Sequence, residues 1–389
     1  MQLYLCLDYY SVMIEKLNEY YDKGLITKQV NPRLPLIIWN YTPKVQIDKL
    51  WDDITLQCRG LVTDTDGNIV ARPFKKFFNY GELDANEIPN EPCRFFEKVD
   101  GSLGIFFWYR DQWVFASRGS FTSDYAIKAK EIFANSVWDN PISPTTIEQL
   151  WRIDLPRFTT LSKEHTYLFE IIFPEGRIVV DYGNVEKLVL LGMIHTATGK
   201  ETGYEDLVEI ADSLNVDVIK EYHDIPIFGI STNDKNGFQN VKYTIKDNEE
   251  GRVVVFKNGF RMKIKGDEYV RLHYIITNFS SRKIWEICRT NGNLEDFLVD
   301  VPDEFYNWAK TTYNDLQGEF KKIKDQVEVE YWDLIDRKEY AEKIKDNKIK
   351  HLLFKRLTSY STRLDDNIWD MLYPEYFNPF SNKIIDDEN

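Results

Sequence analysis

The residues with the clearest chemical potential begin with a lysine in a charged turn, within Phe96-Glu97-Lys98-Val99-Asp100-Gly101-Ser102. The apolar run LGIFFWY (103–109) follows directly and is typical of a strand. A lysine amine at a strand entrance can act as a nucleophile, and Gly101 would let a ligand approach the backbone closely. An ordinary surface turn is the alternative, because a lysine-x-aspartate-glycine tetrapeptide often occurs by chance.

A second segment places three cations on one face of a strand. In Phe260-Arg261-Met262-Lys263-Ile264-Lys265 the basic and apolar side chains alternate, so Arg261, Lys263 and Lys265 share a face. Like charges at this spacing repel each other unless an anion lies over them. The pattern predicts a polyphosphate site, with an ordinary half-exposed strand as the alternative.

Two carboxylates are candidates for the same site. Glu170 interrupts the apolar run TYLFEIIF (166–173), and burying it is costly unless it meets a cation, a metal or a hydroxyl. Glu250 precedes Gly251 and the apolar run RVVVF (252–256). For Glu170 the alternative is the exposed face of an edge strand, and for Glu250 it is a solvated acidic run.

Basic residues also alternate with aromatic ones upstream, in CRG (58–60) and RPFKKFFN (72–79). This composition suits phosphate contacts combined with stacking on a base, although each piece alone is weak. The chain has no GxGxxG motif. The segment 192–200 departs from a P-loop in its glycine spacing, and Glu201 stands where a P-loop has Ser or Thr.

The apolar pattern predicts two kinds of structure along the chain. Residues 35–265 consist mostly of short apolar runs between turn residues, and Asn258-Gly259 is a hairpin signal, so we expect antiparallel sheets rather than a doubly wound fold. Besides the runs above, we expect strands at 36–41, 113–117, 177–182 and 187–194, and helices at 123–138 and 203–214.

Beyond about residue 267 the period changes to that of amphipathic helices. The predicted fold class is α+β, with antiparallel sheets flanked by helices over residues 1–275 and an all-helical C-terminal domain over 276–389. Within that domain, residues 336–356 contain eight Lys or Arg against four Asp or Glu. This stretch is either an RNA-backbone contact or a solvated helix face.

Composition bounds the function classes. The 389 residues carry a formal charge of −14, which excludes a generic basic nucleic-acid coat. Four cysteines without a CxxC pair favour a reducing compartment over a disulfide framework or a zinc ribbon. We find no signal peptide at the start and no apolar run of roughly 20 residues, so a cytoplasmic protein without a membrane span is expected.

Taken together and in order, these segments resemble the nucleotidyltransferase motifs of covalent ligases and capping enzymes. The likeness is greatest to ATP-dependent RNA ligases of the T-even phage tRNA-repair type, the RNA ligase 1 family. It covers roughly residues 35–275. The matching pieces are CRG (58–60), RPFKKFFN (72–79), EKVDGS (97–102), SRGS (117–120), LFEIIFPEGRIV (168–179), KLVLLGM (187–193), EEGRVVVF (249–256) and FRMKIKGDEYVRLH (260–273).

The resemblance implies a role for each matching residue. Lys98 would form lysyl-AMP, while Lys263 and Lys265 would bind the α-phosphate and the leaving pyrophosphate. Neighbouring cations would lower the pKa of the Lys98 amine and so activate it. The other implied nucleotide-binding residues are Arg59, Lys76, Phe78, Glu97, Asp100, Gly101, Arg118, Glu170, Glu250 and Gly251, with Glu170 on the ribose. Glu250, Glu295 and Asp296 would hold the metal.

The implied enzyme uses ATP with Mg²⁺ or Mn²⁺ to join RNA 5′-phosphate and 3′-hydroxyl ends. RNA or tRNA repair in a bacterial or phage-infected cell is the expected setting. No membrane and no obligate protein partner are implied. The alternatives are a GTP-dependent capping guanylyltransferase, a DNA ligase and an inactive RNA-binding relative.

Overall fold

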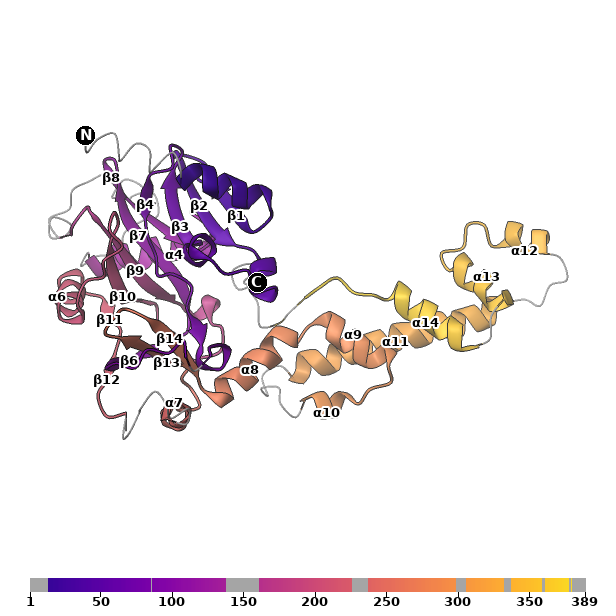
Figure 1. The fold of residues 1–389 in the computed structure, drawn as a ribbon. Coiled ribbons are helices and arrows are strands. Elements are labelled where there is room, and N and C mark those ends of the chain that lie inside the picture. Colours follow the sequence, from indigo (N-terminus) through magenta and orange to yellow (C-terminus); the bar gives the residue numbers. More distant parts are fainter. Residues whose placement is uncertain are drawn as a thin grey trace. The chain divides into compact units, whose positions relative to one another are not determined.

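The structure is a computed structural model that describes residues 13–84, 86–137, 161–225, 237–298, 306–331, 337–358, 361–377 and 379 (Figure 1). The described residues divide into two compact units, one ending at Val270 and one beginning at Arg271. The domain boundary expected between 275 and 276 falls inside helix α8 (Asp267–Asn278).

The first unit contains three sheets, in which the described strands pair antiparallel except β10 with β11 and β14 with β5 (Figure 1). The predicted α+β class with antiparallel sheets is confirmed. The four-stranded sheet has the order β1 (Ile26–Val30), β2 (Leu36–Tyr41), β3 (Arg59–Asp64), β4 (Ile69–Ala71). One five-stranded sheet has the order β11 (Asp217–Val218), β10 (Lys187–His195), β9 (His165–Ile172), β7 (Ser102–Tyr109), β8 (Gln112–Ser117). The other has the order β12 (Glu221–Tyr222), β6 (Cys93–Lys98), β13 (Gly251–Phe256), β14 (Arg261–Lys265), β5 (Phe78–Asn79).

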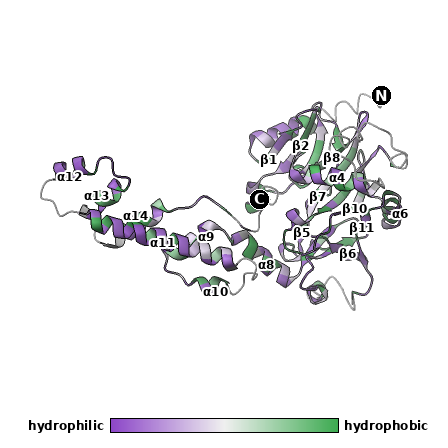
Figure 2. Ribbon diagram, turned by 180° about the vertical axis from the view of Figure 1, so that it is seen from behind, coloured by the Kyte–Doolittle hydropathy of each residue, from purple (hydrophilic) through white to green (hydrophobic). Residues whose placement is uncertain are grey.

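The sheet that contains β7 and β9 is covered on both faces. Phe106 and Phe169 pack with helices α4 (Asp124–Val137) and α6 (Tyr204–Leu214), whereas Ile105 and Leu168 pack towards the four-stranded sheet. Burial on both faces explains why these strands are continuously apolar in sequence, and in Figure 2 the strands of this unit are largely green. The short helices of the unit are α2 (Pro43–Ile47), α3 (Asp53–Gln57), α7 (Gly237–Val241), η1 (Tyr80–Glu82), η3 (Pro174–Gly176) and η4 (Lys242–Thr244).

One predicted strand is wrong. Residues 177–182 form a loop after η3, although Val179 and Val180 are buried as their sequence pattern suggests. The backbone N–H groups of both valines donate to Oδ2 of Asp100 at 2.8 Å. Because a carboxylate takes these donors, they are not available to a neighbouring strand. The other predicted strands and helices of the first unit are present within the described residues.

The second unit is helical. Its helices are the remainder of α8, α9 (Ser281–Arg289), α10 (Leu294–Leu298), α11 (Tyr306–Glu330), α12 (Arg337–Lys343), α13 (Lys350–Thr358) and α14 (Ser361–Met371). One core cluster joins α9 to α11 and α14 around Trp285 and Trp369, and another joins α11 to α13 and α14 around Val327 and Leu352. No helix in the described part of the chain is both long enough and apolar enough to cross a membrane.

Candidate active site

Strand register brings the predicted lysines together. Gly251 on β13 pairs with Lys98 at the end of β6 on one side and with Lys265 at the end of β14 on the other. The predicted Asn258-Gly259 hairpin connects β13 to β14 and so sets this alignment. Lys98 and Lys265 therefore flank the same residue, and Glu250 immediately precedes it.

The Glu250 carboxylate joins the two lysines. Lys98 Nζ donates to Glu250 Oε2 at 2.6 Å, and Lys265 Nζ lies 3.0 Å from Oε1. Glu250 is only 3% exposed, so the two ammonium groups compensate the cost of burying its charge. Glu250 is therefore no part of a solvated acidic run.

The environment of Lys98 differs from the expectation that neighbouring lysines lower its pKa. Burial acts to lower the pKa of the Lys98 amine, but the acidic groups around it, Glu250 above all, outweigh burial and raise it above its ordinary value. Without a ligand, Lys98 is therefore a protonated amine and not yet a nucleophile.

Lys263 behaves in the opposite way. Burial lowers the pKa of its amine to about 7, and the positive charges of Lys98, Lys265, Lys76 and Arg59 act in the same direction. The predicted polyphosphate site is thus a cluster of cations that repel each other until an anion binds. Arg261, the third basic residue on this face of β14, forms an ion pair with Glu201.

Glu170 lies on a central strand, because β9 pairs with both β7 and β10. The edge-strand alternative is therefore wrong. Burial raises the pKa of the Glu170 carboxyl to about 8, while Lys98 and Arg59 oppose this increase. A carboxyl that stays protonated near neutral pH can donate a hydrogen bond as well as accept one.

Gly101 permits close packing of the turn that follows Lys98. A Cβ atom at Gly101 would lie 2.6 Å from the carbonyl oxygen of Ile171 and 3.0 Å from Cγ of Glu170. Any larger residue would push this turn away from β9. We expected Gly101 to admit a ligand, but in the structure the space is filled by the neighbouring strand.

Asp100 orders the surroundings of the turn. Its Oδ1 accepts a hydrogen bond from Tyr269 Oη at 2.8 Å, and its own N–H donates to Tyr182 Oη at 2.9 Å. Together with the two valine amides, these bonds connect the turn to the loop 177–182 and to the start of α8. Sequence reasoning missed both tyrosines, and only Tyr269, four residues after Lys265, lies in a motif that it had singled out.

Arg252 holds the segment that leads to Glu250. This arginine is 2% exposed, and its guanidinium donates to the Glu249 carboxylate and to the carbonyl oxygens of Thr244 and Gly251. It also lies 3.9 Å from the ring centroid of Tyr222. On the next strand Arg252 is in register with Glu97, whose pKa is raised mainly by burial. Arg252 was not among the predicted site residues.

The upstream basic and aromatic residues form a second cluster. Lys76 Nζ lies 5.4 Å from the ring centroids of Tyr41 and Trp51 and 5.5 Å from that of Phe78, and it donates to Gln46 at 2.8 Å. Phe78 is on β5, which pairs with β14 next to Lys263. Lys76 and Phe78 therefore adjoin β14, the cationic strand that carries Lys263 and Lys265.

Arg59 and Arg118 lie where β3 closely approaches the residue that follows β8. Arg59 begins β3, and its charge acts on both Glu170 and Lys263. Arg118 follows β8, where its carbonyl oxygen accepts from Asn40 Nδ2. Gly60 has φ of +87°, and a Cβ atom there would lie 3.2 Å from that same oxygen. Glycine therefore allows β3 to approach Arg118.

The predicted metal ligands are divided between the two units, with Glu250 in the first and Glu295 and Asp296 in the second. The described residues contain no cluster of three or more His, Cys, Asp or Glu side chains that could hold a metal ion. Glu295 and Asp296 lie on α10 in the second unit, where Glu295 forms an ion pair with Lys310; their role as ligands stays a prediction. A single carboxylate such as Glu250 suits Mg²⁺, because this ion usually binds only one or two protein carboxylates. Water and substrate phosphates supply its other ligands.

A lysine amine on the buried Glu250 carboxylate, beside the two lysines of β14, combines a nucleophile with the positive charge that nucleotidyl transfer requires. A profile of the family described as RNA ligase matches residues 57–269, which is more than half of the chain. The chain therefore belongs to this RNA ligase family.

Individual relatives are distant. The chain is 24% identical to the RNA ligase of Rhodothermus phage RM378 over 410 aligned positions, which cover 89% of each chain. Among solved structures, an archaeal ATP-dependent RNA ligase shows 13% identity and a TM-score of 0.45, covering 92% of this chain and 95% of that one. The Naegleria gruberi RNA ligase with PPi shows 12% identity and a TM-score of 0.38, covering 51% of this chain and 57% of that one.

These findings confirm the sequence-based prediction of an RNA ligase, an enzyme whose substrate is RNA, while its use of ATP stays a prediction. They do not favour a capping guanylyltransferase, a DNA ligase or an inactive relative.

Proposed function

We propose that this ligase joins RNA 5′-phosphate and 3′-hydroxyl ends through an AMP carried on Lys98. The Lys98 amine would attack the α-phosphorus of ATP, forming a P–N bond and releasing pyrophosphate. The AMP would then pass to the RNA 5′-phosphate, breaking the P–N bond. Finally the 3′-hydroxyl would attack the activated phosphate, forming the phosphodiester and releasing AMP.

The observation that carries this proposal is the Lys98–Glu250–Lys265 cluster. The amine must lose a proton before it attacks, and Glu250 Oε2, at 2.6 Å, is well placed to accept it. A triphosphate bound by Lys263 and Lys265 would compete with Glu250 for Lys265. The same phosphates would offset the neighbouring positive charges that, in addition to burial, lower the pKa of Lys263.

The remaining roles follow from position. Arg59 and Lys76 adjoin β14 and would contact the nucleotide phosphates or the RNA 5′ end, and Phe78 would help to build the same pocket. Glu170 would bind the ribose. Glu250 would help to hold a Mg²⁺ or Mn²⁺, which would supply positive charge against the phosphates.

We also propose that the helical domain (276–389) recognises RNA and that the enzyme repairs broken RNA, with tRNA as a candidate substrate. The similarity to a phage RNA ligase supports a setting in the cytoplasm of a phage-infected cell.

Labelling with α-³²P-ATP or α-³²P-GTP in the presence of Mg²⁺, followed by a denaturing gel, tests the proposal. We expect ATP alone to label the wild type. The Lys98→Ala substitution should abolish labelling. The variant enzyme should still seal RNA that already carries a 5′-adenylate. The exposed Lys257→Ala should label like the wild type. An AMP adduct that persists in Lys98→Ala would exclude Lys98 as the carrier.

A further inference from the structure

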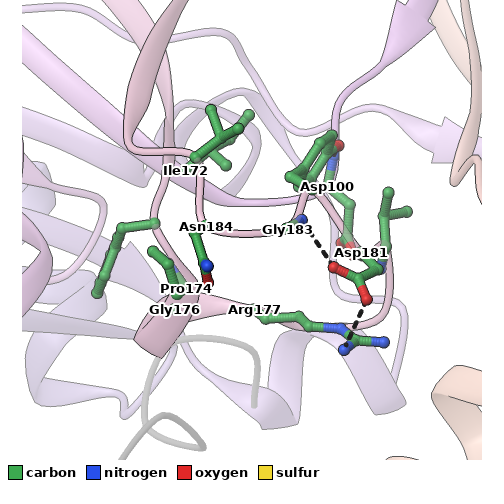
Figure 3. A pocket seen from close by; sticks show the side chains of 12 residues that line it. Asp100, Ile172, Pro174, Gly176, Arg177, Asp181, Gly183 and Asn184 are labelled. Carbon is green, nitrogen blue, oxygen red and sulfur yellow. Dashed lines mark hydrogen bonds and ion pairs between the residues drawn. The ribbon is translucent and has the colours of Figure 1, made fainter.

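A cavity of about 300 Å³ lies beside the turn that follows Lys98 (Figure 3). It is formed by the end of β9, by η3 and by the loop up to Val185, with Asp100 also in its lining. Its size is at the lower end of the range for ligand pockets. None of the lysines or arginines assigned to the ATP phosphates lines it.

The walls of the cavity combine apolar and polar groups, and the polar ones include the Arg177–Asp181 ion pair. Ile172, Phe173 and Pro174 contribute side chains from β9 and η3, and Val180 and Val185 contribute from the loop. A Cβ atom at Gly176 would lie 2.6 Å from the Phe173 ring, so this ring lies directly against the glycine backbone. These apolar side chains can hold a flat aromatic ring by dispersion and stacking.

Polar groups are available where they could select a ligand. The amide of Asn184 has no hydrogen-bond partner among the described residues, and in Figure 3 its side chain extends towards Pro174 and Gly176. The Tyr182 hydroxyl accepts from the Asp100 N–H, and its own hydrogen has no acceptor in the described part of the chain. An amide offers both a donor and an acceptor, which is what recognition of a base edge requires.

The loop that forms the cavity is attached to the reaction centre on two sides. Asp100 binds it through the amides of Val179 and Val180. Asn248, two residues before Glu250, exchanges two hydrogen bonds of 2.9 Å with the backbone of Asp181. A ligand in this cavity would therefore lie next to the turn that carries the nucleophile.

We propose that this cavity is a nucleobase subsite for the RNA substrate, holding the base of a nucleotide at or beside an end being joined. The inference rests on the proposed function, because it needs an RNA end at Lys98. The apolar part of the walls, the Asn184 amide and the position beside Asp100 suit a base, whereas the phosphates would lie over the cationic strand β14.

Two substitutions at the exposed Asn184 test the subsite. Asn184→Trp places a ring in the cavity and Asn184→Ala removes the amide. Glu175→Trp and Glu175→Ala are matched controls, because Glu175 is exposed on the same segment but does not line the cavity. We expect all four variants to form lysyl-AMP within about twofold of the wild-type rate. The KM for RNA in sealing should rise about 10-fold or more for Asn184→Trp, and less for Asn184→Ala.

Substrates with a single abasic nucleotide, placed in turn at each of the terminal positions on both sides of the junction, identify the base. For the wild type, an abasic nucleotide at one of these positions should raise the KM for RNA about as much as Asn184→Trp does. In Asn184→Trp the same abasic substrate should raise the KM no further. Unchanged KM in both Asn184 variants would overturn the subsite, and so would abasic effects that add fully to Asn184→Trp at every position. If the wild type forms no lysyl-AMP or seals no RNA, the proposed function itself fails.

Discussion

At the scale of single residues, burial and neighbouring charge assign opposite protonation states to groups of the same type. Lys98 retains its proton chiefly because of the Glu250 carboxylate beside it, whereas burial and neighbouring cations lower the pKa of Lys263 to about 7. The ligand-free site is therefore organised to bind a polyanion first. The nucleophile becomes reactive only when phosphates alter these charges.

Glu170 gives a measurable consequence for stability. In the folded chain the Glu170 carboxyl keeps its proton up to a pH of about 8, whereas in the unfolded chain it releases the proton near pH 4.5. The wild type therefore loses stability between these values as pH rises. We expect Glu170→Gln, which cannot ionise, to gain on the order of 2 kcal/mol relative to the wild type between pH 5 and pH 8.

Urea unfolding at pH 5, 6.5 and 8, without nucleotide, measures this difference. The exposed Glu209→Gln on α6 is the control and should change stability equally at every pH. A stability difference between wild type and Glu170→Gln that stays constant across the three pH values would contradict the raised pKa.

At the scale of secondary-structure elements, the register of β6, β13 and β14 assembles the site. Each of these strands contributes one residue of the row Lys98, Gly251 and Lys265. Glu250 lies just outside the ladder, so its position depends on the segment 244–251, which Arg252 holds through hydrogen bonds to three of its residues.

Arg252→Met tests this dependence. Loss of the guanidinium removes one hydrogen-bond donor each from Glu249 and two carbonyl oxygens, which should lower the free energy of unfolding by about 2–3 kcal/mol. Displacement of Glu250 should also slow lysyl-AMP formation by about 10-fold or more per folded molecule. Single-turnover labelling below the unfolding transition measures the rate.

Arg94→Met is the matched control, since Arg94 lies on β6 in the same sheet and forms a half-exposed ion pair with Glu221. It should leave the labelling rate unchanged, and Arg252→Lys should restore part of the lost rate. An Arg252→Met protein that is destabilised but labels at the wild-type rate would show that Glu250 is positioned without Arg252.

At the scale of the whole molecule, the two units differ in structure and in proposed role. The sheet-rich unit contains the nucleophile, the cationic strand and their carboxylates. The helical unit has its own core clusters and carries the basic stretch 336–356 on and around α12 and α13. RNA affinity and AMP transfer should therefore be separable by mutation.

Changing Lys345, Lys348 and Lys350 together to Glu tests the separation, since all three are exposed. We expect RNA affinity to fall about 10-fold or more near 0.1 M salt, with a shallower salt dependence, because phosphate contacts are lost. Lysyl-AMP formation should not change. A control variant with Glu at Lys310, Lys321 and Lys322 of α11 carries the same charge change elsewhere in the unit. Equal RNA affinity in both variants, measured by fluorescence anisotropy, would reject the basic stretch as the contact.

Much of the architecture was predictable from sequence because it depends on local pattern. Strands such as 36–41 and 187–194 are apolar runs long enough to be buried, and the helices 123–138 and 203–214 have the matching period. Strict alternation along 260–265 correctly places Met262 and Ile264 in the core and the lysines on the opposite face. The order of the motifs was sufficient to indicate an RNA ligase.

Tertiary structure decided which groups meet. Lys98 and Glu250 are 152 positions apart, and only the pairing of β6 with β13 brings their charges together and reverses the expected pKa shift. Residues 177–182 have a strand-like sequence but form a loop, because a carboxylate 79 positions away takes the amide hydrogen of Val179. Local sequence sets which way a side chain faces, whereas its electrostatic surroundings and backbone partners come from distant segments. Arg252 and Tyr269 escaped sequence analysis for the same reason.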